Sequence, residues 1–326
     1  MTKIQNIGVL TSGGDSPGMN ACIRAIVRQG LSSGLSVFGI YDGFNGMIDN
    51  HIKKLVYGDV SNIIQRGGTI LGTARSERFL DAAFRKVAFE NLKDNDIDGV
   101  IVLGGDGSFK GAKVFFEEYN LPFIGVPCTI DNDINGTEYT IGFDTALNNA
   151  ISAIDKIKDT ASAHHRIFLV EVMGNNSGLI ALNTALTTGS EDVFIPEIEE
   201  NFAQFETKIQ RAISANKSSI IIVSEGDEIG GARELFNYLK TKNLHQKIRV
   251  TVLGHIQRGG APTFLDRKMA TEFGVMAINQ FVKNNYNRTL GLKNGKIYTY
   301  DFESVKGGES VDFQELLNTI HSLSLY

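Results

Sequence analysis

The sequence predicts an α/β protein built from two doubly wound, Rossmann-like lobes, each with a parallel sheet. Three observations lead to this expectation. Short apolar runs rich in Ile and Val recur along the chain, each ends in a polar loop that contains glycine, and a helical period often follows. Such runs are typical of strands buried on both faces, and helices between them complete βαβ units. The length of 326 residues favours two domains.

Six runs are expected to be strands: Ile7–Leu10, Gly99–Leu103, Phe123–Val126, Ile167–Val172, Ile220–Val223 and Val250–Leu253. Five segments are expected to be helices: Gly18–Gln29, Ser108–Tyr119, Thr145–Ile157, Phe202–Ser214 and Arg267–Val282. No Pro- or Ser-rich linker divides the chain, so we expect it to cross between the lobes more than once. Ligands of open α/β sheets bind beyond the carboxyl ends of the strands. The loops after these runs are therefore the expected place for an enzyme's chemistry.

Composition and charge exclude several function classes. The formal net charge of -5 implies no general attraction to nucleic acid or to an anionic membrane. Cys22 and Cys128 are the two cysteines, without a C-x-x-C motif, so a reducing, cytoplasmic location is expected. The apolar run Ile7–Leu10 is too short for a signal peptide, and no run approaches the ~18 apolar residues of a membrane span.

The first loop with unusual chemistry is Gly-Gly-Asp-Ser-Pro-Gly at residues 13–18. It is neither a G-x-G-x-x-G fingerprint nor a Walker A loop. Paired glycines between a strand and a helix let backbone N–H groups face a phosphate at the helix N-terminus. A tight turn that needs glycine only for its φ angles is the alternative.

The loop Gly104-Gly105-Asp106-Gly107-Ser108 gives a stronger signal. Its glycines let the backbone approach a ligand, and Asp106 offers a carboxylate to Mg²⁺. Ser108 is expected either to cap the following helix or to touch a phosphate. The alternative is a capped turn in which Asp106 forms an Asx-turn. The same short string resembles loops of NAD kinases and lipid kinases, and this resemblance implies nucleotide phosphates without fixing the acceptor.

Two carboxylates at i and i+2 stand beside a hydroxyl in Thr129-Ile130-Asp131-Asn132-Asp133. Like charges this close can raise one pKa, which suits a general base. A polar turn explains the same residues equally well.

Arginines complete the candidate set, because their fork binds two phosphate oxygens. Arg75 lies in a Gly-rich segment, and Arg258 shares a strand-end loop with His255. Arg166 and Arg249 stand next to predicted strands. A solvated surface position is the usual fate of any single arginine. The histidines, His164 and His165 included, show no metal-ligand spacing.

Together these segments resemble the bacterial ATP-dependent 6-phosphofructokinases, in order and at similar separations: Thr11–Asn20, Gly104–Ser108, Pro127–Asp133, Glu171–Gly174 and Gly254–Gly260. The likeness runs from Ile7 to about Met276. Its most specific part is Thr-Ile-Asp-Asn-Asp with Gly-His-Ile-Gln-Arg-Gly-Gly downstream. The resemblance implies an ATP-binding lobe of residues 1–142 plus 257–305. It also implies a lobe for fructose 6-phosphate and effectors, of residues 143–256 plus 306–326.

The resemblance also implies residue roles. Asp131 would be the general base for the sugar's 1-hydroxyl, helped by Thr129, Asp133 and Arg75. MgATP would be held by Gly14, Arg75, Ser76, Gly105, Asp106, Gly107 and Ser108, with Asp106 serving the metal. Fructose 6-phosphate would meet Thr129, Ile130, Asp131, Met173, Gly174, Asn175, Glu225, His255 and Arg258. Arg166 and Arg249 would reach it from a neighbouring subunit, which implies a homo-oligomer, usually a tetramer.

Two positions bear on the phosphoryl donor. Relatives that use pyrophosphate tend to carry Asp in place of Gly107 and Lys in place of Cys128, whereas ATP users usually have Gly at the second position. Gly107 leaves room for the α-phosphate of a nucleotide and therefore favours ATP. Cys128 matches neither class, so a pyrophosphate-dependent phosphofructokinase is the same-class alternative. A kinase for another sugar phosphate or a nucleotide is a broader one.

Two departures from the family pattern give further expectations. The family usually has Met-Gly-Arg where this chain has Met173-Gly174-Asn175, and losing that charge predicts a slower enzyme or an altered donor preference. Tyr57 replaces an effector-binding Arg. The remaining effector set therefore predicts weak or absent regulation by ADP and phosphoenolpyruvate: Arg24, Arg28, Lys158, Gly189, Glu191 and Lys217. A catalytically weak sugar-phosphate-binding paralogue is the alternative from another class.

Overall fold

The computed structural model describes residues 4–301 and 311–324, which form two compact units. The first holds residues 4–145 and 258–301, and the second holds 146–257 and 311–324. The chain therefore passes between the units more than once, and its first passage lies within helix α5 (Phe143–His164). The expected lobe boundary between residues 305 and 306 lies outside the described residues.

The first unit is built on a seven-stranded sheet in the order β11-β10-β5-β4-β1-β2-β3. Its strands are β1 (Asn6–Thr11), β2 (Ser36–Ile40), β3 (Ile52–Leu55), β4 (Gly99–Gly104), β5 (Phe123–Pro127), β10 (Arg288–Lys293) and β11 (Lys296–Tyr300). The five inner strands run parallel, while β3 and β11 pair antiparallel at the two edges. Strand β4 is buried along its whole length, as expected for a strand covered on both faces.

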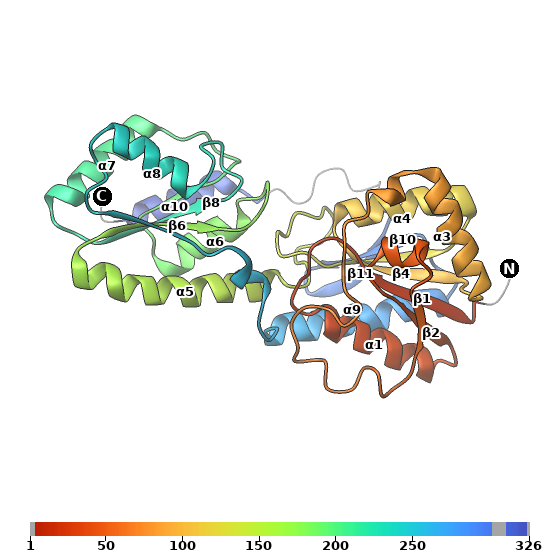
Figure 1. Ribbon diagram of the computed structural model, residues 1–326. Coiled ribbons are helices and arrows are strands. Elements are labelled where there is room, and N and C mark those ends of the chain that lie inside the picture. Colours follow the sequence, from red (N-terminus) through yellow and green to blue (C-terminus); the bar gives the residue numbers. More distant parts are fainter. Residues whose placement is uncertain (1–3, 302–310, 325–326) are drawn as a thin grey trace. The chain divides into compact units, whose positions relative to one another are not determined.

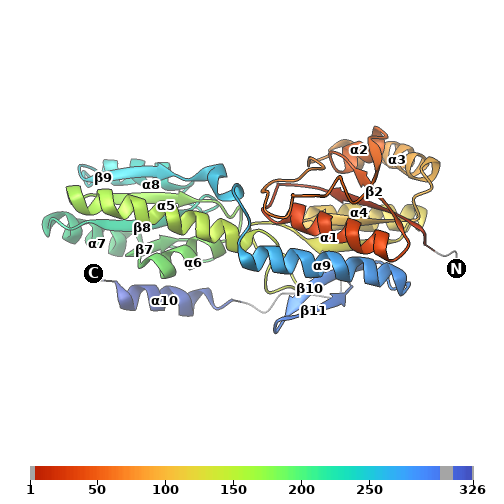
Figure 2. The ribbon, with the colours of Figure 1, turned by 90° about the horizontal axis from the view of Figure 1, so that it is seen from below.

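Two helical layers cover the first sheet (Figure 1). Helices α1 (Met19–Ser32) and α9 (Phe264–Val282) lie side by side on one face, as Figure 2 shows. The opposite face carries α2 (Phe44–Ile48), the 3-10 turn η1 (Arg78–Leu80), α3 (Ala82–Asp94) and α4 (Asp106–Tyr119). Each layer has its own apolar core, so the sheet is doubly wound.

The second unit holds a parallel four-stranded sheet in the order β7-β8-β6-β9. Its strands are β6 (Ile167–Val172), β7 (Asp192–Phe194), β8 (Ser219–Ser224) and β9 (Ile248–Val252). Helices α7 (Phe202–Ser214) and α8 (Ala232–Thr241) bury an apolar core against one face. Helix α6 (Leu179–Thr188) packs on β8, and α10 (Phe313–Leu323) packs on α6.

The expected fold class and all six strands are confirmed, with small shifts of the ends. The largest shift is at the last strand, where β9 spans Ile248–Val252 instead of Val250–Leu253. The expected helix Phe202–Ser214 has the predicted bounds, whereas α9 begins earlier because Thr263 caps it through a bond to the Asp266 N–H. No helix of the described residues has both the length and the apolar character that a bilayer crossing requires.

Candidate active site

In the first unit, three loops meet beyond the carboxyl ends of adjacent parallel strands. Strands β1, β4 and β5 are neighbours, so the segments after Thr11, Gly104 and Pro127 lie together. The Ser108 hydroxyl donates to Ser12 Oγ at 2.9 Å, and the Cys128 N–H donates to the Gly104 carbonyl at 3.0 Å. These bonds hold the three loops together at this edge of the sheet.

Helix α4 starts at Asp106, two residues earlier than expected, so Ser108 does not cap it. Ser108 lies inside the first turn, where its hydroxyl faces Ser12 instead of the helix end. The N-cap residue is Gly105, which has no side chain to satisfy the orphan N–H groups of the helix. These donors point beyond the end of the strand and are suited to an anion.

The glycines of this loop differ in whether packing requires them. A Cβ at Gly104 would lie 2.6 Å from Ser108 Oγ and 2.7 Å from the Ser12 carbonyl oxygen, so packing requires glycine there. At Gly105 and Gly107 a Cβ would meet nothing within 4 Å, and neither residue has a positive φ. The protein's own packing thus leaves open space beside both residues, next to the start of α4.

Arg258 lies directly over the first glycine loop. A Cβ at Gly14 would come within 2.7 Å of Arg258 Nη1, which itself donates to the Asp15 carbonyl at 2.9 Å. The guanidinium is therefore fixed by backbone, and its position requires glycine at residue 14. Arg258 belongs to the first compact unit. His255 is exposed and belongs to the second unit.

The segment that carries Arg75 is tied to the same loop. The Thr73 hydroxyl donates to the Gly13 carbonyl at 2.9 Å, and the Gly13 N–H donates to the Ala74 carbonyl at 3.4 Å. The Arg75 side chain is exposed and makes no hydrogen bond or ion pair within residues 4–301 and 311–324. Its guanidinium is thus available to a ligand while its backbone neighbours are held.

The Thr129–Asp133 loop is braced from inside by an asparagine. Asn132 adopts a left-handed conformation with φ 52°. Its side-chain oxygen Oδ1 accepts from the Thr140 N–H at 2.7 Å, and its side-chain Nδ2 donates to the Glu138 backbone carbonyl at 3.0 Å. The Thr140 hydroxyl also donates to the Thr129 carbonyl at 2.6 Å. The residues on either side of Asn132 are therefore rigidly presented, with the Asp131 N–H donating to Thr129 Oγ1.

The pKa of Asp133, in this loop, is raised by burial first and by the charge of Asp106 second. The expected like-charge effect thus involves the Asp106 carboxylate of the neighbouring loop. Asp106 is half exposed and forms an ion pair with Lys110, one helical turn further on. No group of three His, Cys, Asp or Glu residues able to hold a metal occurs in the described residues.

In the second unit, Glu225 organises the loop that follows β6. Its Oε1 accepts from the Asn175 N–H at 3.0 Å and from the Gly174 N–H at 3.3 Å. Met173, just before them, is buried. Met173, Gly174, Asn175 and Glu225 are therefore brought together, as predicted, at the carboxyl ends of β6 and β8.

Arg166 and Arg249 lie at the opposite end of the same sheet. Arg166 immediately precedes β6, and Arg249 is the second residue of β9, paired with Phe168. A six-residue strand spans about 20 Å, so within one chain these arginines are remote from the loop of Met173.

The predicted effector residues fall into two groups. In the first unit Arg24 and Arg28 lie one turn apart on α1, and burial and the Arg28 charge lower the pKa of Arg24. Arg28 stands over the Tyr57 ring, 5.9 Å from its centroid. The remaining residues lie in the second unit: Lys158 on α5, Gly189 at the end of α6, and Glu191 and Lys217 before β7 and β8.

Several residues that shape the site were missed from the sequence. Thr140 braces the Asp131 loop, and Asn45, Asp49 and Arg78 hold the Arg75 segment. None of them stands in a glycine-rich strand-end loop. Only their contacts in the folded chain identify them, and sequence spacing carries no signal for such contacts.

Comparison with known proteins gives the family. The phosphofructokinase family model matches residues 6–281. The chain belongs to the phosphofructokinase family. The ATP-dependent 6-phosphofructokinase 2 of Bacteroides thetaiotaomicron is 43% identical over 326 residues, covering 100% of both chains. The ATP-dependent 6-phosphofructokinase of Aquifex aeolicus is 48% identical over 309 residues, covering 94% of this chain and 96% of the relative. The family resemblance expected from the motifs is confirmed.

Solved structures agree with the family's fold. Phosphofructokinase from Saccharomyces cerevisiae superposes with a TM-score of 0.86 at 34% identity over 98% of this chain. This chain spans only 48% of the length of that yeast chain. The pyrophosphate-dependent phosphofructokinase from Marinobacter aquaeolei has a TM-score of 0.82 at 21% identity, over 97% of this chain and 91% of its own, which shows a shared fold alone.

Proposed function

We propose that this family member transfers the γ-phosphoryl group of MgATP to the 1-hydroxyl of fructose 6-phosphate, giving fructose 1,6-bisphosphate and ADP. The observation that carries the proposal is the open space beside Gly105 and Gly107 at the uncapped start of α4. Backbone N–H groups there are preorganised for phosphate, and Arg75 stands exposed on an anchored segment. The family's ATP-dependent bacterial members support the same reaction. As a glycolytic step, it fits the expected cytoplasmic location.

In this mechanism Asp131 takes the proton of the attacking hydroxyl, a step worth ~10²–10⁴-fold in rate. Arg75 and the N–H groups at the start of α4 stabilise the charge spread over the equatorial oxygens of a loose transition state. Ser76, Gly14 and Ser108 shape the ATP side, and Thr129, Ile130 and Asp133 line the sugar side. Met173, Gly174, Asn175, Glu225, His255 and Arg258 hold fructose 6-phosphate.

The residues fit a magnesium ion. Mg²⁺ takes a few protein carboxylates and completes its shell with phosphate oxygens and water. Asp106 and Asp133 supply two carboxylates, and burial together with the charge of Asp106 raises the pKa of Asp133. Asp106 would hold the ion, which neutralises phosphate charge when bound.

Gly107 supports ATP over pyrophosphate as the donor. Since a side chain at residue 107 would meet no protein atom within 4 Å, the glycine is not required by packing. An Asp there would extend into the open space and repel an α-phosphate. Cys128 is buried, and burial raises the pKa of its thiol, so it is poorly placed to bind phosphate.

A homo-oligomer, a tetramer in this proposal, would complete the sugar site. Arg166 and Arg249 lie at the amino end of the second sheet, far from the Glu225 loop of their own chain. They can therefore serve the 6-phosphate only of another subunit. The exposed edge strand β9 carries Arg249 on its surface.

Regulation by ADP and phosphoenolpyruvate should be weak. The Arg28 guanidinium stands over the Tyr57 ring, where the family carries an additional cation. One fewer charge lowers anion affinity at that half of the effector site. Assays with each effector at sub-millimolar concentration test this. Clear activation by ADP would contradict it.

The decisive experiment measures initial rates of fructose 1,6-bisphosphate formation with Mg-ATP and Mg-pyrophosphate side by side. Wild type is compared with Asp131→Ala and with the control Asp94→Ala, an exposed carboxylate at the end of α3. Turnover with ATP that Asp131→Ala abolishes and Asp94→Ala preserves supports the proposal.

Other outcomes select the alternatives. Turnover only with pyrophosphate would overturn the donor argument from Gly107. Binding of fructose 6-phosphate to a folded oligomer without turnover of either donor would favour a sugar-phosphate-binding paralogue.

A further inference from the structure

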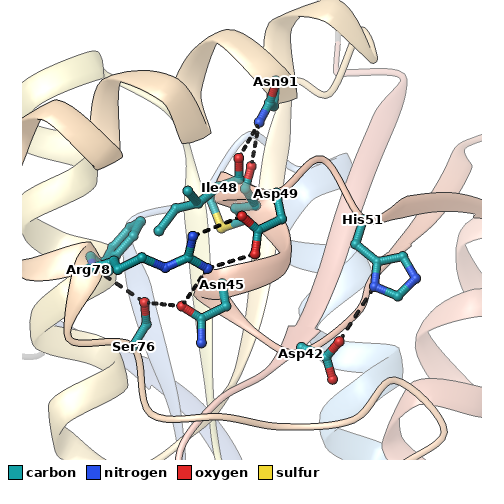
Figure 3. A network of polar contacts seen from close by, with 10 residues as sticks. Asp42, Asn45, Ile48, Asp49, His51, Ser76, Arg78 and Asn91 are labelled. Carbon is teal, nitrogen blue, oxygen red and sulfur yellow. Dashed lines mark hydrogen bonds and ion pairs between the residues drawn. The ribbon is translucent and has the colours of Figure 1, made fainter.

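A polar network outside the expected site joins α2 to the segment that carries Arg75 (Figure 3). Arg78, at the start of η1, forms a bidentate pair with the Asp49 carboxylate through both terminal nitrogens of its guanidinium. Nη1 donates to Oδ1 at 2.9 Å and Nη2 to Oδ2 at 2.6 Å. Asp49 is the C-cap residue of α2, so this pair links η1 to a separate helix.

The same arginine reaches a third partner. Arg78 Nη2 also donates to Asn45 Oδ1 at 3.2 Å, and that oxygen accepts from the Ser76 hydroxyl at 2.6 Å. Two donors on one carbonyl oxygen fix which way the Asn45 amide faces. Ser76 is fixed in turn, because its hydroxyl also accepts from the Phe79 N–H at 3.3 Å.

Arg75 lies between two anchored points. On its C-terminal side Ser76 is held by Asn45. On its N-terminal side the Thr73 hydroxyl and the Ala74 carbonyl are hydrogen-bonded to the backbone of Gly13, in the glycine loop of residues 13–18. The backbone of Arg75 is therefore confined on both sides while its own side chain stays exposed.

The support for this network is itself rigid. Asn91 of α3 donates to the Met47 and Ile48 carbonyls, both at 2.9 Å, and so holds the end of the short helix α2. Phe44 and Phe79 stack beneath, with ring centroids 4.1 Å apart. Packing fixes the two backbones, and the polar network fixes the side chains between them.

We propose that Arg78 is a positioning residue for phosphoryl transfer, acting through Asn45 and Ser76 on Arg75. This inference rests on the proposed function, since it assigns Arg78 a role in placing a group that meets the donor phosphates. A misplaced catalytic group costs rate steeply, even when the change is made at a distance. Arg78 itself touches no reacting atom.

The network contributes position more than stability. The side chains of Arg78 and Asp49 are 40% and 54% exposed. An ion pair as exposed as this adds little to the free energy of unfolding. Losing it should therefore leave the folded protein intact and release only the Ser76 side of the Arg75 segment.

The test compares steady-state kinetics of Arg78→Ala with wild type and with Lys53→Ala. The control removes another solvent-accessible ion pair of the same unit, that of Lys53 with Asp59. We expect Arg78→Ala to lower kcat roughly fivefold to twentyfold, with KM for fructose 6-phosphate and the melting temperature unchanged. Lys53→Ala should match wild type. Arg78→Lys, which keeps the charge but not the fork, should fall between.

A double variant separates positioning from a direct role. If Arg78 acts through Arg75, then Arg75→Ala/Arg78→Ala should be no slower than Arg75→Ala alone. Additive losses would overturn the inference, as would an Arg78→Ala enzyme with wild-type kcat. If Arg78→Ala fails to fold, Asn45→Ala replaces it in the test. Asn45→Ala removes the middle link of the network and should show the same loss of kcat, roughly fivefold to twentyfold. A folded wild type that turns over no donor would overturn the proposed function and this inference together.

Discussion

At the scale of single residues, Asn175 stands where the resemblance in the sequence leads us to expect an arginine. The residue has a φ of 52°, a left-handed conformation that asparagine tolerates better than most side chains. Its exposed side chain follows Gly174, whose N–H is bonded to Glu225. In the proposed mechanism this amide can donate a hydrogen bond to the transferring group, but it brings no charge.

Asn175→Arg should raise kcat/KM with ATP about fivefold to tenfold, since a charge-assisted bond is worth about 1 kcal/mol more than a neutral one. The matched control is Asn175→Gln, which carries the same backbone cost without the charge. Steady-state rates of all three proteins decide the point. Equal rates for Arg and Gln variants would show that the missing charge is irrelevant.

Asp266 shows a different residue-scale effect. Its buried carboxylate accepts from the Gly142 N–H and the Thr145 N–H, both at 2.8 Å, and from the Thr145 hydroxyl. Asp266→Asn would turn an N–H₂ group toward one of these donors. We expect a loss of about 1–3 kcal/mol in the free energy of unfolding, measured by urea titration. An unchanged midpoint would mean that the loop rearranges to accept the amide.

At the scale of elements, α10 is held to the second sheet by a buried charge cluster. Asp192 accepts from Lys208 at 2.8 Å and contacts His321 of α10 at 2.7 Å. Burial alone would raise the pKa of Asp192, but bonds to His321 and Lys208 lower it overall. The contact between α10 and the second sheet therefore involves the ionised carboxylate of Asp192.

Asp192→Asn should cost about 3 kcal/mol in the free energy of unfolding, because it leaves a partly buried lysine without its counter-charge. The control Glu272→Gln weakens an exposed pair with Lys268 and should cost less than about 0.5 kcal/mol. Urea titration of both variants measures the difference. Similar small losses for both would mean that α10 is held by apolar packing alone.

The elements also show what the sequence could predict. Strands such as β4 and β6 were found because a strand buried on both faces needs an unbroken apolar run. The five-residue helix α2 and the edge strand β3 were missed, since neither is long enough to show a period. Helix α10 was missed because the tail offered few cues before it.

In the candidate site, too, some residues could be predicted from the sequence and others could not. Loops with clustered glycine and aspartate stand out, because close approach to a ligand demands those residue types. The Asn45–Arg78 network did not stand out, since its members look like ordinary surface polar residues and meet only after folding. Supporting residues are chosen by tertiary contacts, which a single sequence does not reveal.

At the scale of the whole molecule, buried carboxyl groups set the dependence of stability on pH. Burial raises the pKa of Glu200 to about 8 and that of Asp266 to about 6. A carboxyl with a raised folded-state pKa stabilises fully below its unfolded pKa and loses that contribution as pH rises through the folded value. Asp192, whose pKa is lowered, acts in the opposite sense and loses its contribution in acid.

The melting temperature should therefore be highest in mildly acidic buffer, near pH 5, and fall toward pH 8.5. Glu200→Gln should remove much of the decline above pH 6, because the amide has no charge to bury. Scanning calorimetry from pH 4 to 9 on both proteins measures this. A wild-type melting temperature that rises from pH 5 to 8.5 would contradict it.

The proposed assembly makes a last whole-molecule prediction. If each sugar site takes Asp131 from one chain and Arg249 from a neighbour, then Asp131→Ala and Arg249→Ala should each be nearly inactive. Mixed after unfolding and refolding together, the two variants should recover roughly a quarter of wild-type activity, since half of the randomly formed pairs are hybrids with one intact site of two. Mixing without refolding is the control, and should give nothing if subunits do not exchange. Failure to recover activity in proven hybrids would contradict the proposal that Arg249 serves the sugar site of a neighbouring chain.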